Sequence, residues 1–243
     1  MHAAPENTLG SLKLGWEEGA DAAEIDVWRT KDDQIVVSHD VSLKRTTGVD
    51  KSINDMTLAE VCTTEVNTEK FPRYAGEKIP SLAQVFAALP SEKRLIIEIK
   101  GNDAQLVPAL KRVVDTSGVS LDRLYFSSFT IGQLQTVRKL MPEARTLLLW
   151  GSPWKKEKRP PEELDQIIKL STSSGFSGLL LAEDLPLDET AAKKIHDNGL
   201  IFYMWSVHQV PFAYRMATLG ASGLLVDRPA WIRNGIDQLA RDK

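Results

Sequence analysis

Short apolar segments alternate with longer amphipathic segments along most of this 243-residue sequence. The short segments are rich in Leu, Ile, Val and aromatic residues, as buried strands are, and the longer ones repeat apolar residues with the spacing of a helix. From about residue 95 onward, each predicted strand is followed by a predicted helix. This order is typical of a parallel sheet with helices packed outside it.

The same pattern sets the limits of the individual elements. A first helix begins after Asn7 or Thr8 and ends at Gly19. Strands are predicted at 22–28, 35–38, 95–99, 124–127, 145–150, 178–182, 200–207 and 223–226. Further helices are predicted at 80–89, 104–115, 131–140, 161–171, 187–198 and 211–219, and after the last strand. Eight strands and no linker-like composition predict one domain over residues 1–243, with the (β/α)8 fold of a TIM barrel.

Two regions depart from the regular alternation. The turn at residues 31–33 is too short to hold a helix, so the first two strands do not form a βαβ unit. Residues 41–80 form an irregular insertion with a short helix predicted near 57–61. An excursion of this length is either a functional lid or a solvated insertion. A separate basic segment, residues 155–159, is predicted as a solvated loop, with contact to an anionic substrate as the alternative.

Composition narrows the class of protein. Hydrophobic residues make up 42% of the chain and charged residues 26%, which is ordinary for a soluble globular domain. The net charge of −3 argues against a nucleic-acid partner. No apolar run approaches the roughly 20 residues that span a bilayer, so no integral membrane segment is predicted. A single cysteine, Cys62, excludes an internal disulfide and fits a reducing compartment, so we expect a cytoplasmic location. Export of a protein without disulfides stays open as the alternative, with any export signal upstream of Met1.

Chemically active side chains gather where predicted strands end. Glu24 and Asp26 are two residues apart and share one face of a strand, and His39 ends the next strand. Glu98 and Lys100 repeat the two-residue spacing on a third strand. Carboxylates that share a face of a core strand are costly to bury unless a positive charge lies between them. A hard divalent cation, Mg²⁺ or Ca²⁺, bound by Glu24, Asp26 and Glu98 would meet that need.

The other residues suit the handling of a phosphate ester. Lys100 would neutralise a phosphate oxygen, and His39 has the intrinsic pKa to move a proton near neutral pH. Trp205, late in its strand, would form an apolar wall for a small polyol or headgroup. Each feature also has a plain structural alternative: a solvent-facing acid pair, an ion pair between Glu98 and Lys100, and a tryptophan in the core.

Several short motifs follow one another in a fixed order along the chain. They are Pro5-Glu-Asn-Thr8, Glu24-Ile-Asp26-Val27, His39-Asp40, Arg45-Thr-Thr47, Glu98-Ile-Lys100, Ser127-Ser-Phe129, Trp205-Ser-Val207 and Asp227-Arg-Pro229. As a series, these motifs resemble the glycerophosphodiester phosphodiesterase family. The resemblance covers nearly the whole chain, up to about residue 229.

The resemblance implies a barrel that hydrolyses glycerophosphodiesters to glycerol 3-phosphate and an alcohol, with Mg²⁺ or Ca²⁺ as cofactor. In that family the glycerol hydroxyl of the substrate commonly attacks phosphorus, and water opens the resulting cyclic intermediate. The implied roles are cation binding by Glu24, Asp26 and Glu98, acid/base catalysis by His39, phosphate contact by Lys100, contact with the glycerol side by Phe129 and Trp205, and a supporting polar contact by Glu6.

The N-terminal region departs from the family pattern. Family members carry a strand ending in His-Arg-Gly shortly before Pro-Glu-Asn-Thr, whereas this sequence begins Met1-His2-Ala-Ala-Pro5. His2 lies too close to Pro5 to replace the missing histidine. We therefore expect the biological chain to begin upstream of Met1. The chain as given would lack one barrel strand, would have an open seam, and would be weak or inactive.

Two other functions stay open at this point. The first is a non-catalytic barrel that binds a phosphorylated ligand, which the missing histidine and arginine favour if Met1 is the true start. The second is a related phosphodiesterase that acts on lysophospholipids, which a more apolar groove above Trp205 would favour.

Overall fold

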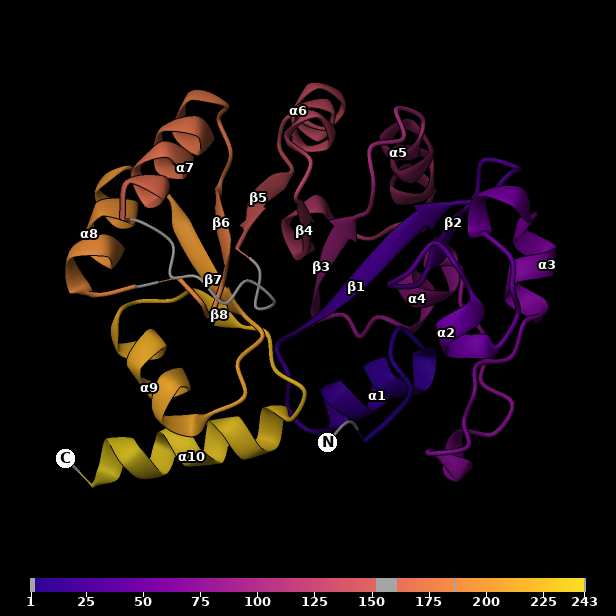
Figure 1. Cartoon of the computed structure of the whole chain (residues 1–243), viewed down its shortest axis with the longest axis horizontal. Coiled ribbons are helices and arrows are strands. Elements are labelled where there is room, and N and C mark those ends of the chain that lie inside the picture. Colours follow the sequence, from indigo (N-terminus) through magenta and orange to yellow (C-terminus); the bar gives the residue numbers. More distant parts are fainter. Residues whose placement is uncertain (1–2, 152–160, 186, 243) are drawn as a thin grey trace.

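One curled sheet with helices on its outer side forms the body of the protein (Figure 1). The computed structural model describes residues 3–151, 161–185 and 187–242, so the basic segment 155–159 and His2 lie outside the described residues. None of the helices in this described part is long and apolar enough to cross a membrane. The strands are β1 (Ala22–Arg29), β2 (Ile35–Val37), β3 (Arg94–Ile99), β4 (Leu124–Ser128), β5 (Arg145–Trp150), β6 (Gly178–Ala182), β7 (Ile201–Trp205) and β8 (Gly223–Leu224).

The strand order is β2-β1-β3-β4-β5-β6-β7-β8. All neighbours pair in parallel except β1 and β2, which form an antiparallel hairpin. Its turn is closed by the amide of Thr30, which donates to the carbonyl oxygen of Gln34 at 2.8 Å. The prediction that residues 31–33 hold no helix is confirmed. So is the predicted fold class, an α/β barrel architecture, here with one side left open.

Helices follow the strands as the apolar spacing predicted. They are α1 (Leu9–Glu17), α4 (Leu82–Ala88), α5 (Leu106–Ser117), α6 (Ile131–Leu140), α7 (Pro161–Ser173), α8 (Glu189–Asp197), α9 (Val210–Thr218) and α10 (Pro229–Arg241). Thr8, rather than Asn7, caps α1, because its side chain accepts a hydrogen bond from the amide of Ser11. The last two strands are shorter than predicted: β7 was predicted as 200–207 and spans Ile201–Trp205, and β8 was predicted as 223–226 and spans Gly223–Leu224.

The insertion at residues 41–80 has a small core of its own. It contains α2 (Lys44–Thr47), α3 (Leu58–Thr63) and two short 3-10 turns, Ile53–Asp55 and Pro72–Tyr74. Its buried apolar side chains pack together against β2, and they are Leu43, Ile53, Met56, Val61, Val66 and Ile79, with Val36 from the strand. The short helix predicted near 57–61 is confirmed. The insertion is thus a folded unit at the edge of the sheet, and its function as a lid stays a prediction.

Side chains inside the barrel change character along the strands. A small apolar layer, formed by Ile96, Tyr125, Leu147, Leu149, Leu180 and Tyr203, fills the interior. Farther along β1 and β3, the inward positions carry Asp26 and Glu98 instead. Asp26 and Glu98 therefore lie beyond the apolar layer, toward the carboxyl ends of the strands, where barrel enzymes carry their active sites.

The sheet does not close between β8 and β1. On the side away from β3, residues 22–26 of β1 pair with no strand in the described part of the chain, because β2 begins its pairing at Val27. A cavity of about 710 Å³ opens on this side, lined by residues from β1, β8, α1 and α10, and it reaches the acidic residues. The expected open seam is present. The eight predicted strands fail to complete a closed barrel because one of them, β2, extends the opposite edge as a hairpin.

The register between β6 and β7 leaves no space for a side chain at Gly178. A Cβ atom there would lie 2.2 Å from the carbonyl oxygen of Ile201, which is backbone and cannot move aside cheaply. We expect Gly178→Ala to lower the free energy of unfolding by about 1–3 kcal/mol or more, measured by urea denaturation. Gly132→Ala in α6 is the matched control, because nothing lies within 4 Å of its added Cβ. An equal loss in both variants would contradict the close approach of β6 and β7.

Candidate active site

Three carboxylates meet at one end of the barrel because of the register between β1 and β3. Asp26 lies directly opposite Glu98, and Glu24 precedes Asp26 by two residues on the same face. One oxygen from each of Glu24, Asp26 and Glu98 can be chosen so that all three lie within 4.8 Å of one another. The structure therefore brings together the three acids that the sequence analysis selected as cation ligands.

Burial makes this cluster electrostatically expensive. Asp26 and Glu98 are buried, with exposed fractions of 4% and 9%. Loss of hydration raises the pKa of Glu24 well above its usual range, and the negative charges of Asp26 and Glu98 raise it further. Burial also raises the pKa of Glu98, to about 7, although the positive charge of Lys100 opposes this effect. Ionised carboxylates at this site thus need positive charge.

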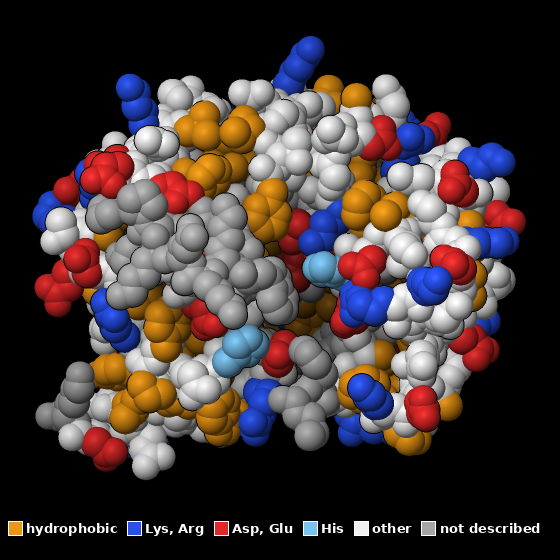
Figure 2. All heavy atoms as spheres, in the orientation of Figure 1, with side chains coloured by type: hydrophobic (Ala, Val, Ile, Leu, Met, Phe, Trp, Pro, Cys, Tyr) orange, Lys and Arg blue, Asp and Glu red, His pale blue; other side chains and the backbone are white. Residues whose placement is uncertain are grey.

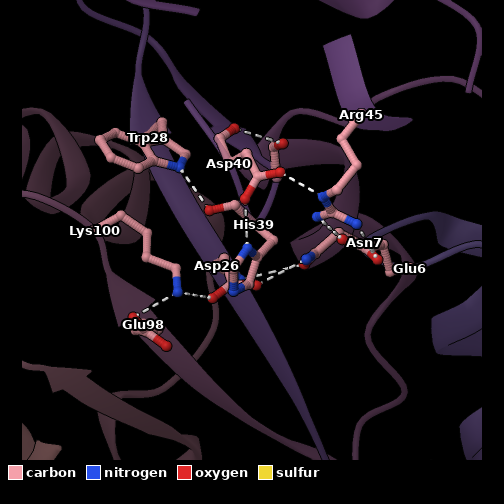
Figure 3. A network of polar contacts seen from close by, with 10 residues as sticks. Glu6, Asn7, Asp26, Trp28, His39, Asp40, Arg45, Glu98 and Lys100 are labelled. Carbon is pink, nitrogen blue, oxygen red and sulfur yellow. Dashed lines mark hydrogen bonds and ion pairs between the residues drawn. The ribbon is translucent and has the colours of Figure 1, made fainter. Parts of the chain in front are cut away.

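Lys100 supplies part of that charge. Its Nζ lies 2.8 Å from Asp26 Oδ1 and 2.6 Å from Glu98 Oε1 (Figure 3). Burial would lower the pKa of Lys100, but the two carboxylates more than offset this and raise it. The ion pair considered as an alternative for Glu98 and Lys100 is therefore present, and it extends to Asp26. One ammonium group does not balance three carboxylates, and such an oxygen-rich cluster fits a hard divalent cation.

Asn7 is a site residue that the sequence analysis considered only as a helix cap. Its backbone has a positive φ of 53°, which Asn tolerates better than most residues. Its amide nitrogen donates to Asp26 Oδ2 at 2.8 Å, and its amide oxygen accepts from the backbone N–H of Asp26 at 3.2 Å. Asn7 thus satisfies β1 at a position without a strand partner on that side and orients the Asp26 carboxylate. The sequence feature that could have indicated Asn7 as a site residue is its position in the motif Pro5-Glu-Asn-Thr8.

His39 follows β2 and lines the same cavity as the acids. Its Nδ1 lies 2.7 Å from Asp40 Oδ1, and its backbone carbonyl oxygen accepts from Trp28 Nε1 at 3.2 Å. More than half of the side chain, 55%, is exposed. Figure 2 shows a hollow near the centre of this face, where acidic and basic side chains lie beside a histidine. His39 can therefore exchange protons with a ligand in the cavity.

Glu6 lines the cavity too, but its direct partner is Arg45 of α2. The guanidinium donates from Nη1 to Glu6 Oε2 at 2.9 Å and from Nη2 to Glu6 Oε1 at 2.5 Å. Its Nε donates to Asp40 Oδ2 at 2.5 Å. These contacts connect the insertion to the segment before α1 and to the loop that carries His39.

Two aromatic residues stand at the rim. The rings of Phe129 and Trp205 meet edge to face, with centroids 5.8 Å apart and planes at 78°. Phe129 is 48% exposed, and Trp205 lines the cavity. All residues predicted for the site are therefore in one region, and their individual functions stay predictions at this stage.

Known proteins are similar to this chain in sequence and in fold. The sequence profile of the glycerophosphoryl diester phosphodiesterase family matches residues 1–231. A glycerophosphodiester phosphodiesterase of Caldanaerobacter subterraneus is 30% identical over 242 residues, covering 95% of this chain and 91% of that protein. A lysophospholipase D of Rattus norvegicus is 27% identical, covering 97% of this chain and 83% of that protein.

A solved structure agrees with these sequence matches. The phosphodiesterase of Oleispira antarctica, solved in complex with the product sn-glycerol-3-phosphate, superposes with a TM-score of 0.84 at 25% identity. The superposition covers 97% of this chain and 92% of that one. The profile spans nearly the whole chain, so the chain belongs to the glycerophosphoryl diester phosphodiesterase family.

Proposed function

We propose that this chain hydrolyses glycerophosphodiesters to glycerol 3-phosphate and an alcohol, with one divalent cation, Mg²⁺ or Ca²⁺. The observation that carries the proposal is the convergence of Glu24 and Asp26 of β1 with Glu98 of β3 inside the barrel. Membership of the phosphodiesterase family supports the reaction class, and the open cavity beside the acids supports a small-molecule substrate.

The three acids would hold the cation. Their oxygen atoms, their mutual distance and the charge that Lys100 leaves uncompensated suit Mg²⁺ or Ca²⁺. A bound cation would draw electron density from a phosphate oxygen and make phosphorus more open to attack. The cation would stabilise the ionised form of Glu24 most, because burial and the acidic neighbours otherwise strongly disfavour that form.

Other side chains would position the substrate and move protons. His39, with its Nδ1 engaged by Asp40, presents the rest of its ring to the cavity and would exchange a proton with the attacking or leaving oxygen. Lys100 would place its ammonium group against a phosphate oxygen. Phe129 and Trp205 would pack against the carbon skeleton of the glycerol, with Glu6 supporting the polar side of the site through Arg45.

A second candidate substrate is a lysophospholipid. The cavity continues from the acids past apolar side chains of the barrel interior and the open side, including Leu149, Leu180, Leu224 and Ile232, which could accommodate an acyl chain. The related rat protein is named a lysophospholipase D. The two substrates can be compared directly by measuring kcat/KM for glycerophosphocholine and for monomeric lysophosphatidylcholine. We expect the higher value for glycerophosphocholine, and the reverse order would favour the second candidate.

In a chain extended upstream to include the expected first strand, His39→Ala should lower kcat by roughly 10²- to 10⁴-fold, because a positioned acid/base group contributes about that much. The rate would be measured as the amount of glycerol 3-phosphate released from glycerophosphocholine in the presence of Mg²⁺ or Ca²⁺. His196→Ala is the matched control, since His196 lies exposed on the outer helix α8. An undiminished rate in His39→Ala would exclude His39 from proton transfer. Binding of glycerol 3-phosphate without any turnover by the upstream-extended chain would favour a non-catalytic barrel instead.

Cation binding should depend on pH in a defined direction. Because burial raises the pKa of Glu98 from its usual 4.5 to about 7, the folded protein retains a proton that the unfolded chain loses. The corresponding stability is fully present below 4.5 and is lost as the pH rises through about 7. A cation needs the ionised form, so the increase in Tm on adding Mg²⁺ or Ca²⁺ should be larger near pH 8 than near pH 5.5.

Two variants control this measurement. Glu98→Gln should remove most of the cation-dependent increase in Tm at both pH values. Asp115→Asn should retain it, because Asp115 is paired with Lys111 on the outer surface of α5. A cation effect of the same size at both pH values would contradict the proposed ligand set.

A further inference from the structure

His39 has little packing of its own to fix its side chain. It lies in the loop after β2, and 55% of its side chain is exposed. Trp28 holds only the backbone of His39, through the hydrogen bond to the carbonyl oxygen. The ring itself is engaged at Nδ1 by Asp40 Oδ1, at 2.7 Å. The orientation of His39 therefore depends on how firmly Asp40 is held.

Asp40 is held from its other oxygen by Arg45. Asp40 Oδ2 accepts from Arg45 Nε, while the two terminal nitrogens of the same guanidinium bind both oxygens of Glu6. Partial burial opposes ionisation of Asp40, but hydrogen bonds from Arg45 and His39 outweigh it and keep the pKa of Asp40 below its usual value. The hydrogen bond from Arg45 likewise keeps the pKa of Glu6 low. Both carboxylates are acceptors only.

We propose that Asp40, Arg45 and Glu6 are positioning residues that act through His39. In the neutral imidazole, Nδ1–H donates a hydrogen bond to Asp40, which leaves the unprotonated Nε2 as the nitrogen that faces the substrate. Arg45 fixes the Asp40 carboxylate, and Glu6 fixes Arg45 (Figure 3). This inference rests on the proposed function of His39 in phosphodiester hydrolysis, and it assigns a task to the Arg45 side chain of the insertion.

A contribution to the stability of the fold does not by itself explain the ion pairs of Arg45 with Glu6 and Asp40. Arg45 and Glu6 are 51% and 43% exposed, and ion pairs between such exposed groups contribute little to the free energy of unfolding. The same α2 helix offers a comparison, because Lys44 pairs with Asp50 at 2.9 Å on the surface. The pair of Arg45 with Asp40 differs in that its carboxylate continues to a histidine in the cavity.

Asp40→Asn is the informative substitution, because of the geometry at Arg45. The guanidinium can only donate, so the amide oxygen of Asn would turn toward Arg45 and its NH₂ group toward His39 Nδ1. Nδ1 would then become an acceptor and the proton would move to Nε2. We expect kcat for glycerophosphocholine to fall roughly 10- to 100-fold with little change in KM, the size typical of lost support for a reactive histidine.

Further variants separate positioning from structural support. Arg45→Lys, which cannot bind both carboxylates in the same fork geometry, should lower kcat by an intermediate factor. In a His39→Ala background, Asp40→Asn should cause no further loss of kcat, because the effects of substituting residues that act as a unit are not additive. Asp50→Asn is the matched control and should leave kcat unchanged, since it breaks the neighbouring ion pair only.

A spectroscopic measurement tests the same point without activity. The chain has 4 histidines, so ¹⁵N-histidine labelling gives few side-chain signals, and His39→Ala assigns the one of interest. The unaltered protein should show His39 with the proton on Nδ1, and Asp40→Asn should show it on Nε2. If the tautomer shifts but neither the upstream-extended protein nor any of its variants hydrolyses the substrate, the proposed function fails and the positioning stands. If hydrolysis is normal and neither tautomer nor kcat changes in Asp40→Asn, this inference is overturned.

Discussion

The parallel pairing of β1 with β3 is the constraint on which the site depends. Its register places Asp26 opposite Glu98, and strand alternation turns Glu24 toward the same interior. Three carboxylates are thereby brought within 4.8 Å of one another, where their charges repel and hydration is reduced. Ordinary core packing would exclude such a cluster, because each buried charge needs a partner. The backbone register therefore creates a demand for positive charge that nearby side chains and a bound cation must meet.

The surrounding residues respond to that demand in different ways. Lys100, two residues after Glu98, returns from the end of β3 and pairs with both Asp26 and Glu98. Asn7 donates to Asp26 from the segment before α1 and so keeps one of its oxygens in place. For Glu24 the charge of Lys100 is not enough: burial and the charges of Asp26 and Glu98 outweigh it and keep the pKa of Glu24 well above its usual value. This asymmetry is the physical reason to expect cation binding rather than a self-sufficient salt bridge.

The acids could be predicted from the sequence because their geometry follows from strand periodicity. Two acids two residues apart in a strand share a face in any sheet, and parallel strands bring their carboxyl ends to one edge. The position of Asn7 could not be predicted in this way, since it depends on a positive φ in a loop. Nor could the contact between Arg45 and Glu6, which are 39 residues apart and are brought together by the packing of the insertion against β2.

The site thus combines two kinds of support. Glu24, Asp26 and Glu98 are placed by backbone hydrogen bonds between strands, which tolerate little change in position. His39 is placed by side-chain contacts between loops, which depend on charge and on an exposed guanidinium. A cation requires a fixed set of oxygens, whereas a proton-transfer group must approach and leave an oxygen of the substrate during the reaction. The rigid strands therefore suit the carboxylates, and the loop held by Asp40 and Arg45 suits the histidine.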